Sequence, residues 1–474
     1  MTKSLTAKFG KESEKMKKND IVKVEIVDIS HDGQGIGKAE DGFVVFVRTA
    51  LLGEILNVHI LKVLKNKAFG KIKDIIKASD MRTEPSCDAF YKCGGCTFWH
   101  TAYENELLIK QSLVKSALKS VSNIDFDVSD IIPSENELKY RNKMLIPIGY
   151  DEKGDISFGF YRMRSHTIIK NDECSILDDV FYVIAKCVVD FMVEFSVEPY
   201  SEEYHKGVIR HLFVRKAEYT GEIMVGIITS TKRLKNSHFL VEKLTSLNKN
   251  IVSVVHNVNP EKTNVILGKK TNLLYGKPYI TDMMNGIKFN VSMLSFYQIN
   301  TKQAEKLYNI AISLMDEGND IVFDLYSGIG TIALNIAKNV KDAKCEKKVY
   351  GIESVAEAVS DANTNKELNN IENAEFICDL VENAVPRLIS EGITPNVIVL
   401  DPPRSGCEKT LIDTIIASKA DKIIYISCNP ATLARDIKIF TENDYNIKLI
   451  QPVDMFPKTY HVETIVLLER IGKL

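Results

Sequence analysis

Hydrophobic and polar residues follow two different rhythms along the chain. Between residues 20 and 77, apolar residues recur at alternate positions in short runs such as IVKVEIVDI, FVVFV and EILNVHILKV. This period of two is typical of β-strands, and together the runs predict a short β-barrel. The glycine-rich stretch HDGQGIGKAEDG follows the first run, and we interpret it as a turn with an exposed loop at residues 31–37.

From about residue 281 onward, helical and strand patterns alternate. The helical stretch TKQAEKLYNIAISLMD precedes the strand patterns IVFDLYSG, VYGIES, AEFICD, VIVLDPP and KIIYISCNP, and two closing strands are expected at IKLIQPVDMF and HVETIVLLER. Strand–helix alternation over about 190 residues predicts an α/β fold with a doubly wound, mainly parallel sheet.

The segment between these two regions is less regular. It begins with the cysteine-rich stretch CDAFYKCGGCTFWH and an amphipathic helix at residues 101–120, which we expect to pack on the C-terminal domain. A strand-rich part follows, in which basic and aromatic residues are interleaved. These residues suggest a groove that follows phosphates and stacks bases, although charged residues are more often simply solvated: Lys139, Tyr140, Arg141, Lys143, Phe160, Tyr161, Arg162, Arg164, His166, Arg210, Arg215 and Lys216.

Composition narrows the class of protein. The chain has 474 residues, 45% of them hydrophobic and 26% charged, with a net charge of −2, so any contact with nucleic acid must come from local basic patches. No apolar run is long enough for a membrane span, and the polar, lysine-rich residues 1–16 read as a disordered basic arm without a signal peptide. We therefore expect a cytoplasmic protein without disulfides. The sequence does not determine the oligomeric state, and a monomer is favoured.

Acidic residues end three of the predicted parallel strands, where ligands bind in such sheets. Asp324 is followed by a glycine-containing turn, and Glu353 stands where a carboxylate can accept hydrogen bonds from ribose hydroxyls, with a helix N-cap as its alternative role. Both features suit either a dinucleotide oxidoreductase or an S-adenosylmethionine methyltransferase. Asp401 precedes two prolines, a pattern common in methyltransferases that act on bases and amides, and this favours the second class.

Cys428 follows the fifth strand, so its thiol is expected to point into the same crevice. A free cysteine is most often a small buried apolar residue, but a thiolate at a strand end is also a nucleophile. Carbon 5 of uracil becomes nucleophilic when a thiolate adds to carbon 6, and a general base must then remove the carbon-5 proton. Glu463, at the start of the last apolar strand, is the candidate base, and His461 competes for this role.

Six short motifs in this order resemble the RNA uracil-C5 methyltransferases over essentially the whole chain: SFYQIN, DLYSGIGT, GIES, LDPPRSG, ISCNP and HVET. The resemblance implies a Rossmann-like class I methyltransferase domain at residues 281–474. It further implies that Cys428 is the nucleophile, that Glu463 is the base and that Phe296 lies beside an extruded uracil. Contacts with S-adenosyl-L-methionine are implied for Gln298, Tyr326, Glu353 and Asp401.

The N-terminal part carries a second resemblance. Residues 17–76 are similar to a TRAM domain, an OB-like RNA-binding barrel, and residues 77–280 then form a central, strand-rich iron–sulfur domain. Cys87, Cys93, Cys96 and Cys174 resemble the family's four-cysteine [4Fe–4S] site, whereas the residues by themselves suit zinc equally well.

The resemblance also implies a substrate. Within the family, a TRAM domain together with a cysteine cluster goes mainly with enzymes that act on 23S ribosomal RNA, so an unpaired loop with a flipped uridine is expected as the target. Transfer RNA is the alternative substrate. A non-catalytic RNA-binding or ribosome assembly factor that keeps the fold is the alternative function.

Overall fold

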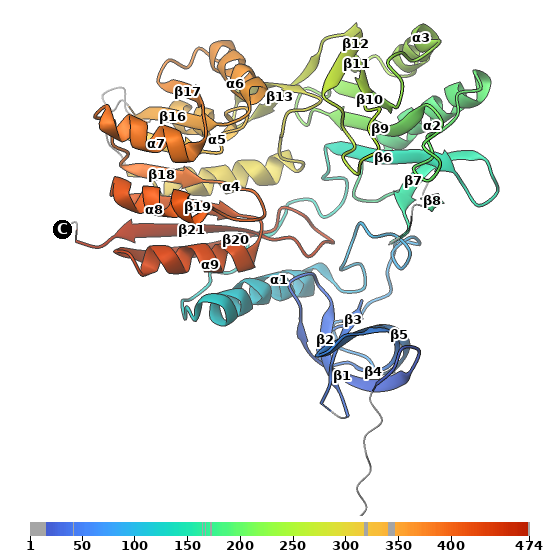
Figure 1. The fold of residues 1–474 in the computed structure, drawn as a ribbon, viewed down its shortest axis with the longest axis horizontal. Helices are drawn as coiled ribbons and strands as arrows, with labels where there is room; N and C mark the ends of the chain where they lie inside the picture. The colour runs from blue at the N-terminus through green and yellow to red at the C-terminus, as the bar shows by residue number, and fades with distance from the viewer. Residues whose placement is uncertain are drawn as a thin grey trace, which may run out of the picture. The chain divides into compact units, whose positions relative to one another are not determined.

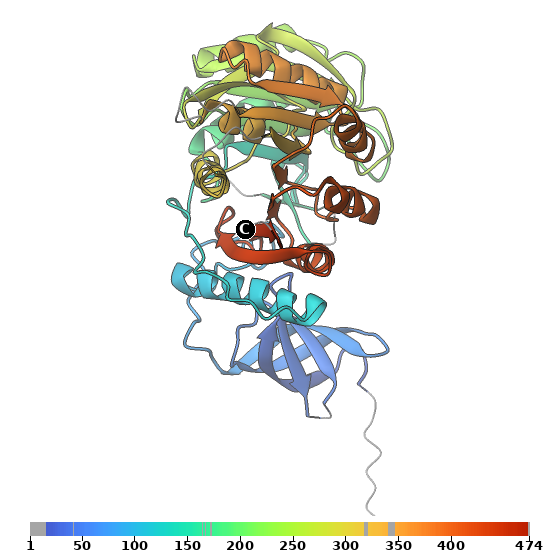
Figure 2. The same ribbon diagram turned by 90° about the vertical axis from the view of Figure 1, so that its left-hand side faces the viewer.

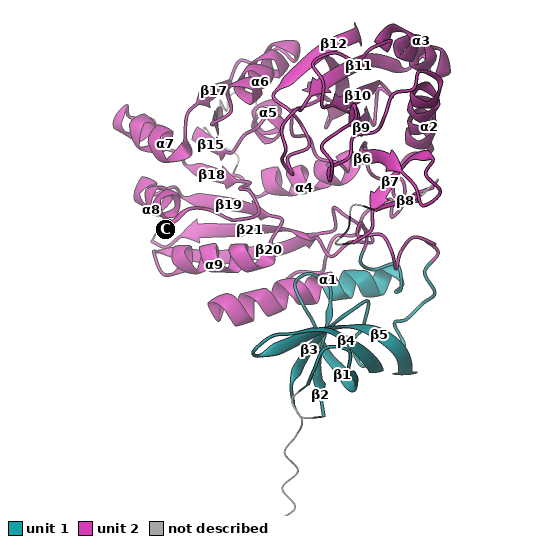
Figure 3. Cartoon of the chain, turned by 45° about the vertical axis from the view of Figure 1, so that its right-hand side comes forward, with its two compact units in different colours: residues 1–85, 97–109 teal, residues 86–96, 110–474 magenta. Residues whose placement is uncertain are grey.

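The computed structural model describes residues 16–40, 42–163, 165, 167–170, 173–316, 321–339 and 347–472. The basic arm up to residue 15, Arg164 and His166 lie outside this set. The chain forms two compact units, residues 1–85 with 97–109 and residues 86–96 with 110–474 (Figure 3). The finer division at residues 76 and 280 stays a prediction.

The first unit contains a closed five-stranded barrel in the order β1-β2-β3-β5-β4 (Figure 1). Alternate side chains of its strands are fully buried, among them Val24, Val45 and Val58, which is why the period-two pattern closes around a core. The strands are β1 (Ile21–Ile29), β2 (Gly35–Ala39), β3 (Val44–Arg48), β4 (Ile55–Val63) and β5 (Lys67–Lys77).

The glycine-rich stretch is not simply a turn, and the expectation of an exposed loop at residues 31–37 is wrong in its second half. Strand β2 begins at Gly35, and Gly37 pairs with Ile26 of β1. A Cβ atom on Gly37 would overlap the side chain of Val24, so glycine here permits the close approach of two strands.

The second unit contains a seven-stranded sheet in the order β12-β11-β10-β9-β6-β7-β8, on which helices α2 and α3 pack. Most neighbouring strands are antiparallel, but β10 and β11 are parallel. This central sheet consists of β6 (Lys143–Tyr150), β7 (Ile156–Tyr161), β8 (Ile168–Lys170), β9 (Ile209–Lys216), β10 (Ile223–Thr229), β11 (Ile251–Val258) and β12 (Lys270–Gly276), and the helices are α2 (Asp179–Glu194) and α3 (Ser237–Leu247).

The other large sheet of this unit has the order β17-β16-β15-β18-β19-β21-β20, and its first five strands are parallel. This confirms the doubly wound, Rossmann-like fold, with the strand order reversing at β15. The strands are β15 (Ile321–Leu325), β16 (Lys348–Glu353), β17 (Ala374–Cys378), β18 (Val397–Leu400), β19 (Lys422–Ser427), β20 (Tyr445–Val453) and β21 (Glu463–Arg470).

Helices cover both faces of this sheet: α4 lies on one face, and α8 and α9 lie on the other (Figures 1 and 2). A hairpin of β13 (Tyr279–Met284) and β14 (Ile287–Ser292) packs into one hydrophobic core with residues of both sheets. The helices are α4 (Thr301–Ser313), α5 (Thr331–Lys338), α6 (Ala356–Leu368), α7 (Val381–Ser390), α8 (Lys409–Ser418) and α9 (Pro430–Thr441).

The predicted helix at residues 101–120 is observed as α1 (Tyr103–Ala117), which contributes residues to both units and continues into a π-helical turn, η1 (Leu118–Ser122). This turn packs against α9 within the second unit, as expected for a helix that lies on the C-terminal domain. Over the part of the chain that the structure describes, no helix is both long and apolar enough to cross a membrane.

Candidate active site

The carboxyl ends of β15, β16 and β18 place three acidic residues at the switch point of the sheet, the edge at which doubly wound folds form their ligand crevice. After β15 the chain makes a tight turn in which Tyr326, Gly328 and Gly330 all have positive φ angles, of 69°, 54° and 82°. Gly330 caps α5, and a Cβ atom there would lie 2.6 Å from the ring of Phe376. The turn therefore needs glycine at this position and leaves the backbone open to a ligand.

Glu353 accepts hydrogen bonds from backbone groups on both sides of the crevice. Its Oε2 accepts from the Gly328 amide at 3.1 Å, and its Oε1 accepts from the Val355 amide at 2.9 Å. The alternative role of Glu353 as a helix N-cap is not observed, because the N-cap residue of α6 is Val355 and no side chain among the described residues caps that helix. Oε1 also accepts a hydrogen bond from the Ser354 hydroxyl at 3.3 Å, so the second lone pair of Oε2 is the one with which Glu353 can accept a hydrogen bond from a ligand.

Asp324 lies within electrostatic range of both Asp401 and Glu353. Oδ2 of Asp324 accepts a hydrogen bond from the Ala333 amide at 2.9 Å, whereas its buried Oδ1 has no hydrogen-bond partner among the described residues. Burial, followed by the charges of Asp401 and Glu353, raises the pKa of Asp324 well above its usual range. Burial raises the pKa of Asp401 to about 7. A positively charged ligand would relieve this accumulation of acidic groups.

The motif SFYQIN is linked to the acidic strand ends through Tyr308, which lies within electrostatic range of Asp401 and Asp324. Gln298 is buried, its backbone carbonyl accepts a hydrogen bond from Asn142 at 2.8 Å, and its side chain hydrogen-bonds to Tyr308. Asn300 caps α4, so the motif ends where the helix begins. Phe296 is 68% exposed, which leaves its ring available to a partner outside the chain.

Cys428 lies directly after β19, one residue before the N-cap of α9. Asn429 accepts a hydrogen bond from the Ala431 amide at 3.1 Å, and Pro430 is the first helical residue, so the backbone turns outward at the thiol. Burial, then the charges of Glu463 and Asp401, raises the pKa of the Cys428 thiol to about 11, while Arg404 acts in the opposite direction. The thiol is therefore protonated at neutral pH unless a ligand changes its surroundings.

Glu463 begins β21, the strand that pairs with β19, and so faces Cys428. The pairing of Ser427 with Thr464 brings the two residues next to each other at the same edge. Burial, followed by the charge of Asp401, raises the pKa of Glu463 to about 8. His461 lies 3.3 Å from Arg404 through its Nε2, and burial lowers its pKa to about 4, so it is neutral.

A buried ion pair that the sequence did not predict holds residues 454–456, shortly before Glu463. Lys110 of α1 lies 2.7 Å from Asp454, and both side chains are completely buried. The same ammonium group donates a hydrogen bond to the Phe456 carbonyl at 3.1 Å. No local pattern identifies Lys110, because its partner lies 344 residues further along the chain.

The cysteine-rich loop belongs to the second unit, which also contains Cys174. Burial raises the pKa of the Cys174 thiol, and the charges of Cys87 and Cys93 raise it further, so these three thiols lie within electrostatic range of one another. Cys96 follows on the same loop. Nevertheless, no group of three or more cysteine, histidine or acidic side chains is arranged to hold a metal ion within the described ranges.

The prediction of a basic groove is wrong for several of its residues, because their side chains are buried. Arg215 is buried and donates to the carbonyls of Ser292 at 2.8 Å and Ser295 at 3.1 Å, so it stabilises the fold. Arg210 is equally buried, and Tyr140 is buried with its hydroxyl on the Pro457 carbonyl. Lys143 remains half-buried, and burial together with the charges of Arg215 and Arg141 lowers its pKa to about 8.

Comparison with known proteins identifies the family. The family model described as tRNA (uracil-5-)-methyltransferase matches residues 102–471, and that of the TRAM domain matches residues 15–73. The chain belongs to the tRNA (uracil-5-)-methyltransferase family. Proteins named uncharacterized RNA methyltransferase from Clostridium tetani and Clostridium acetobutylicum are 43% and 42% identical to it, over 96% and 97% of this chain and 98% and 99% of theirs.

The fold agrees with this assignment. The crystal structure of Pyrococcus abyssi tRNA (uracil-54, C5)-methyltransferase in complex with S-adenosyl-L-homocysteine is similar with a TM-score of 0.76, at 26% identity, over 94% of this chain and 99% of that one. This uracil-5-methyltransferase is therefore an RNA-modifying enzyme that uses S-adenosyl-L-methionine.

Proposed function

We propose that this methyltransferase converts a uridine of 23S ribosomal RNA to 5-methyluridine through a covalent adduct with Cys428. The observation that carries the proposal is the juxtaposition of Cys428 and Glu463 at the ends of two paired strands, beside the acidic crevice. Methyl transfer to nitrogen or oxygen needs no thiol, whereas transfer to carbon 5 of uracil does. A thiol and a carboxyl group that face one site match that requirement.

The proposed reaction begins when the Cys428 thiol gives its proton to solvent. The thiolate then forms a bond to carbon 6 of the uracil, and the double bond between carbons 5 and 6 opens to an enolate. Arg404 is the neighbouring cation that favours the thiolate. S-adenosyl-L-methionine, when bound, supplies the methyl group that carbon 5 accepts. The Glu463 carboxylate then takes the proton from carbon 5, the bond between sulfur and carbon 6 breaks, and the thiolate leaves as the ring double bond returns.

We propose that the cofactor is contacted by Gln298, Tyr326, Glu353 and Asp401. Their support is the position of the last three at the strand ends around the switch point, together with the placement of Gln298 beside Tyr308. Phe296 is proposed to stack on the extruded base or on its neighbour, and its exposure supports this role.

The test replaces Cys428 with alanine and uses Cys187→Ala, on helix α2, as the matched control. Cys428→Ala should abolish transfer of labelled methyl groups to ribosomal RNA while RNA affinity persists, and Cys187→Ala should behave like the wild type. RNA containing 5-fluorouridine should trap a covalent adduct on the peptide of Cys428, because fluorine cannot leave as the proton does. An adduct on another peptide would overturn the proposed nucleophile.

Ribosomal RNA is favoured as the substrate by the combination of a TRAM domain and a cysteine-rich loop. Transfer RNA is the second candidate, because the similar Pyrococcus abyssi enzyme is a tRNA (uracil-54, C5)-methyltransferase. Mapping 5-methyluridine in both RNA classes from cells that lack this protein distinguishes them. Wild-type protein that transfers methyl groups to neither RNA would instead favour a non-catalytic RNA-binding or assembly factor.

We also propose that Cys87, Cys93, Cys96 and Cys174 hold a [4Fe–4S] cluster. Four soft thiolate donors suit iron–sulfur clusters, and the mutual electrostatic influence of Cys87, Cys93 and Cys174 supports their convergence. Protein purified without oxygen should be brown and contain iron and acid-labile sulfide. Stoichiometric zinc without iron would assign the site to a structural zinc ion instead.

A further inference from the structure

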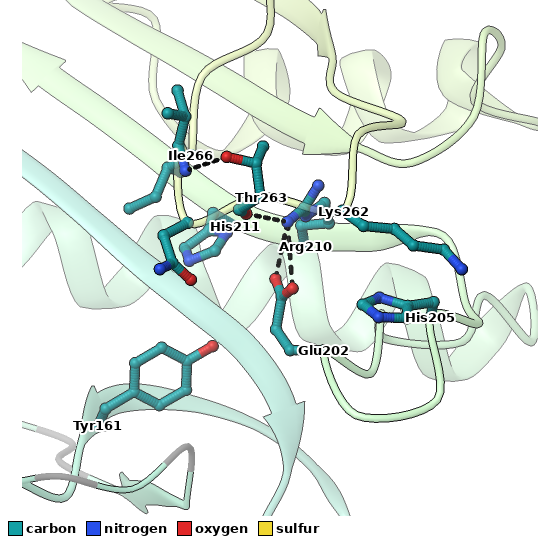
Figure 4. Close-up of a pocket in the computed structure, with 10 residues that line it drawn as sticks. Tyr161, Glu202, His205, Arg210, His211, Lys262, Thr263 and Ile266 are labelled. Atoms are coloured by element: carbon teal, nitrogen blue, oxygen red, sulfur yellow. Dashed lines mark hydrogen bonds and ion pairs between the residues drawn. The ribbon is translucent and has the colours of Figure 1, made fainter.

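A cavity of about 230 Å³ opens on the central sheet, and it shares no lining residue with the acidic crevice (Figure 4). Its walls come from β9, from the end of β7 and from the two loops at residues 202–205 and 262–266. The volume lies below the range of about 300–1,000 Å³ of pockets for drug-sized ligands, so it suits a single heterocycle.

One wall of the cavity is built around Arg210, whose charge is already neutralised. The guanidinium is 2% exposed and donates to both carboxylate oxygens of Glu202, at 2.9 and 3.2 Å (Figure 4). It also donates to the carbonyls of Asn259 at 3.0 Å and Glu261 at 2.8 Å. Arg210 therefore shapes the cavity and leaves little net charge inside it, which argues against a simple anion site.

The loop that closes the cavity is held in place by buried amide side chains. Asn259 donates from Nδ2 to the carbonyls of Val265 at 2.7 Å and Ile266 at 2.9 Å. Asn257 donates to the Gly268 carbonyl at 2.8 Å and accepts from the Gly268 amide at 2.7 Å. These bonds need no ligand, so the cavity is formed in advance.

His211 forms a neutral aromatic part of the cavity wall. It is 5% exposed, lines the cavity, and its buried Nδ1 has no hydrogen-bond partner in the described part of the chain. Burial and the charge of Arg210 lower the pKa of His211 to about 4, so the imidazole is neutral. Its Nδ1 is closed off from solvent, so His211 offers the cavity the face of a neutral ring and not this nitrogen.

The remaining lining suits a planar ring joined to a phosphate. Tyr161 offers an aromatic face and Val265 an apolar one, and the exposed Lys262 carries a positive charge at the mouth. We propose that this cavity binds one unpaired nucleotide of the RNA substrate, with its base beside Tyr161 and His211 and its phosphate on Lys262. The proposal rests on the RNA-modifying function, and it adds a recognition site whose lining residues differ from those proposed to hold the reacting uridine. Glu202 can accept further hydrogen bonds, and an exocyclic amino group offers two donor hydrogens against the single N3–H of uracil, so we expect bases with an amino group to bind more tightly than uracil.

The test measures binding by the full chain, without any methyl transfer. Fluorescence anisotropy with labelled oligo(A) and oligo(U), and competition by AMP and UMP, are compared for three variants. Val265→Trp fills the cavity from a position that is 62% exposed, and Lys262→Gln removes the charge at its mouth. Lys249→Gln, on an exposed residue outside the cavity, is the matched control.

Val265→Trp should weaken oligo(A) binding about fivefold or more, the loss expected when one stacked base is displaced. Lys262→Gln should reduce the slope of log affinity against log salt by about 0.7. Lys249→Gln should change neither the affinity nor the base preference.

Three results would overturn parts of the proposal. If both cavity variants bind oligo(A) as tightly as the wild type does, the cavity is not an RNA site. If AMP nevertheless binds to the wild type, the cavity is assigned to a free nucleotide. Equal binding of oligo(A) and oligo(U) would exclude the preference for amino groups. Since these measurements need no methyl transfer, an enzyme without activity on ribosomal RNA would refute the proposed reaction and leave the cavity assignment standing.

Discussion

Replacing Lys110 with methionine should destabilise the second unit strongly. The change removes the ammonium group that lies 2.7 Å from the completely buried Asp454 carboxylate. The Phe456 amide still donates a hydrogen bond to that carboxylate at 3.1 Å. Breaking a buried ion pair by removing one partner costs about 3–5 kcal/mol, because the other charge stays buried and uncompensated. We expect a loss of that size in the free energy of unfolding.

The assay is urea unfolding followed by far-ultraviolet circular dichroism, with the transition of the second unit analysed separately because the chain has two units. Lys438→Met is the matched control. Lys438 lies 4.0 Å from Glu442 in an exposed pair, so its loss should change stability by no more than about 0.5 kcal/mol.

A double variant tests the reasoning itself. Lys110→Met with Asp454→Leu replaces both charges by apolar side chains, and it should recover most of the lost stability because no buried charge remains. If Lys110→Met costs no more than Lys438→Met, or if the double variant is less stable than Lys110→Met, the pair does not stabilise the fold in this way. If the double variant recovers its stability but is inactive, the ion pair also positions Glu463.

Three further predictions concern titration and packing. Glu463 has a folded-state pKa of about 8 against an ordinary value of 4.5, so the folded protein binds more protons than the unfolded chain between these values. Stability should therefore fall by up to about 1.4 kcal/mol per pH unit as pH rises through this window, and Glu463→Gln should flatten the fall measured by urea unfolding. The rate of methyl transfer in the wild type should rise as pH approaches 8, because the base acts as a carboxylate; a flat profile would exclude Glu463 as the base. Lys143, with a pKa of about 8, should lose its charge above that pH, so RNA affinity should decline there in the wild type and stay level in Lys143→Gln. Gly37→Ala should destabilise the barrel by about 1–3 kcal/mol, because the added Cβ atom overlaps Val24, and hydrogen exchange of the barrel amides should become faster. Gly53→Ala is the comparison: its Cβ atom meets no neighbouring atom, so any loss of stability there comes from the positive φ angle alone.

Local patterns were sufficient for the elements that build the active site. The strand ends at Asp324, Glu353 and Asp401 could be predicted because a parallel strand is a continuous apolar run with a polar residue at its end. The same holds for Pro430 as the first residue of α9. In the barrel, the pattern failed at Gly35–Ala39, because glycine signals a turn locally but here accommodates a neighbouring strand.

The amino-acid sequence by itself determined the order of the elements, the family motifs and the alignment of reactive residues at one sheet edge, since these depend on neighbours a few positions apart. Only the tertiary structure decided which charges are buried. Lys110 and Arg215 look like surface residues in the sequence yet are completely or almost completely enclosed, and the acidic crevice raises the pKa of Asp401 and Glu463. Burial and long-range partners set the energy of a charge, and neither is encoded in a local pattern.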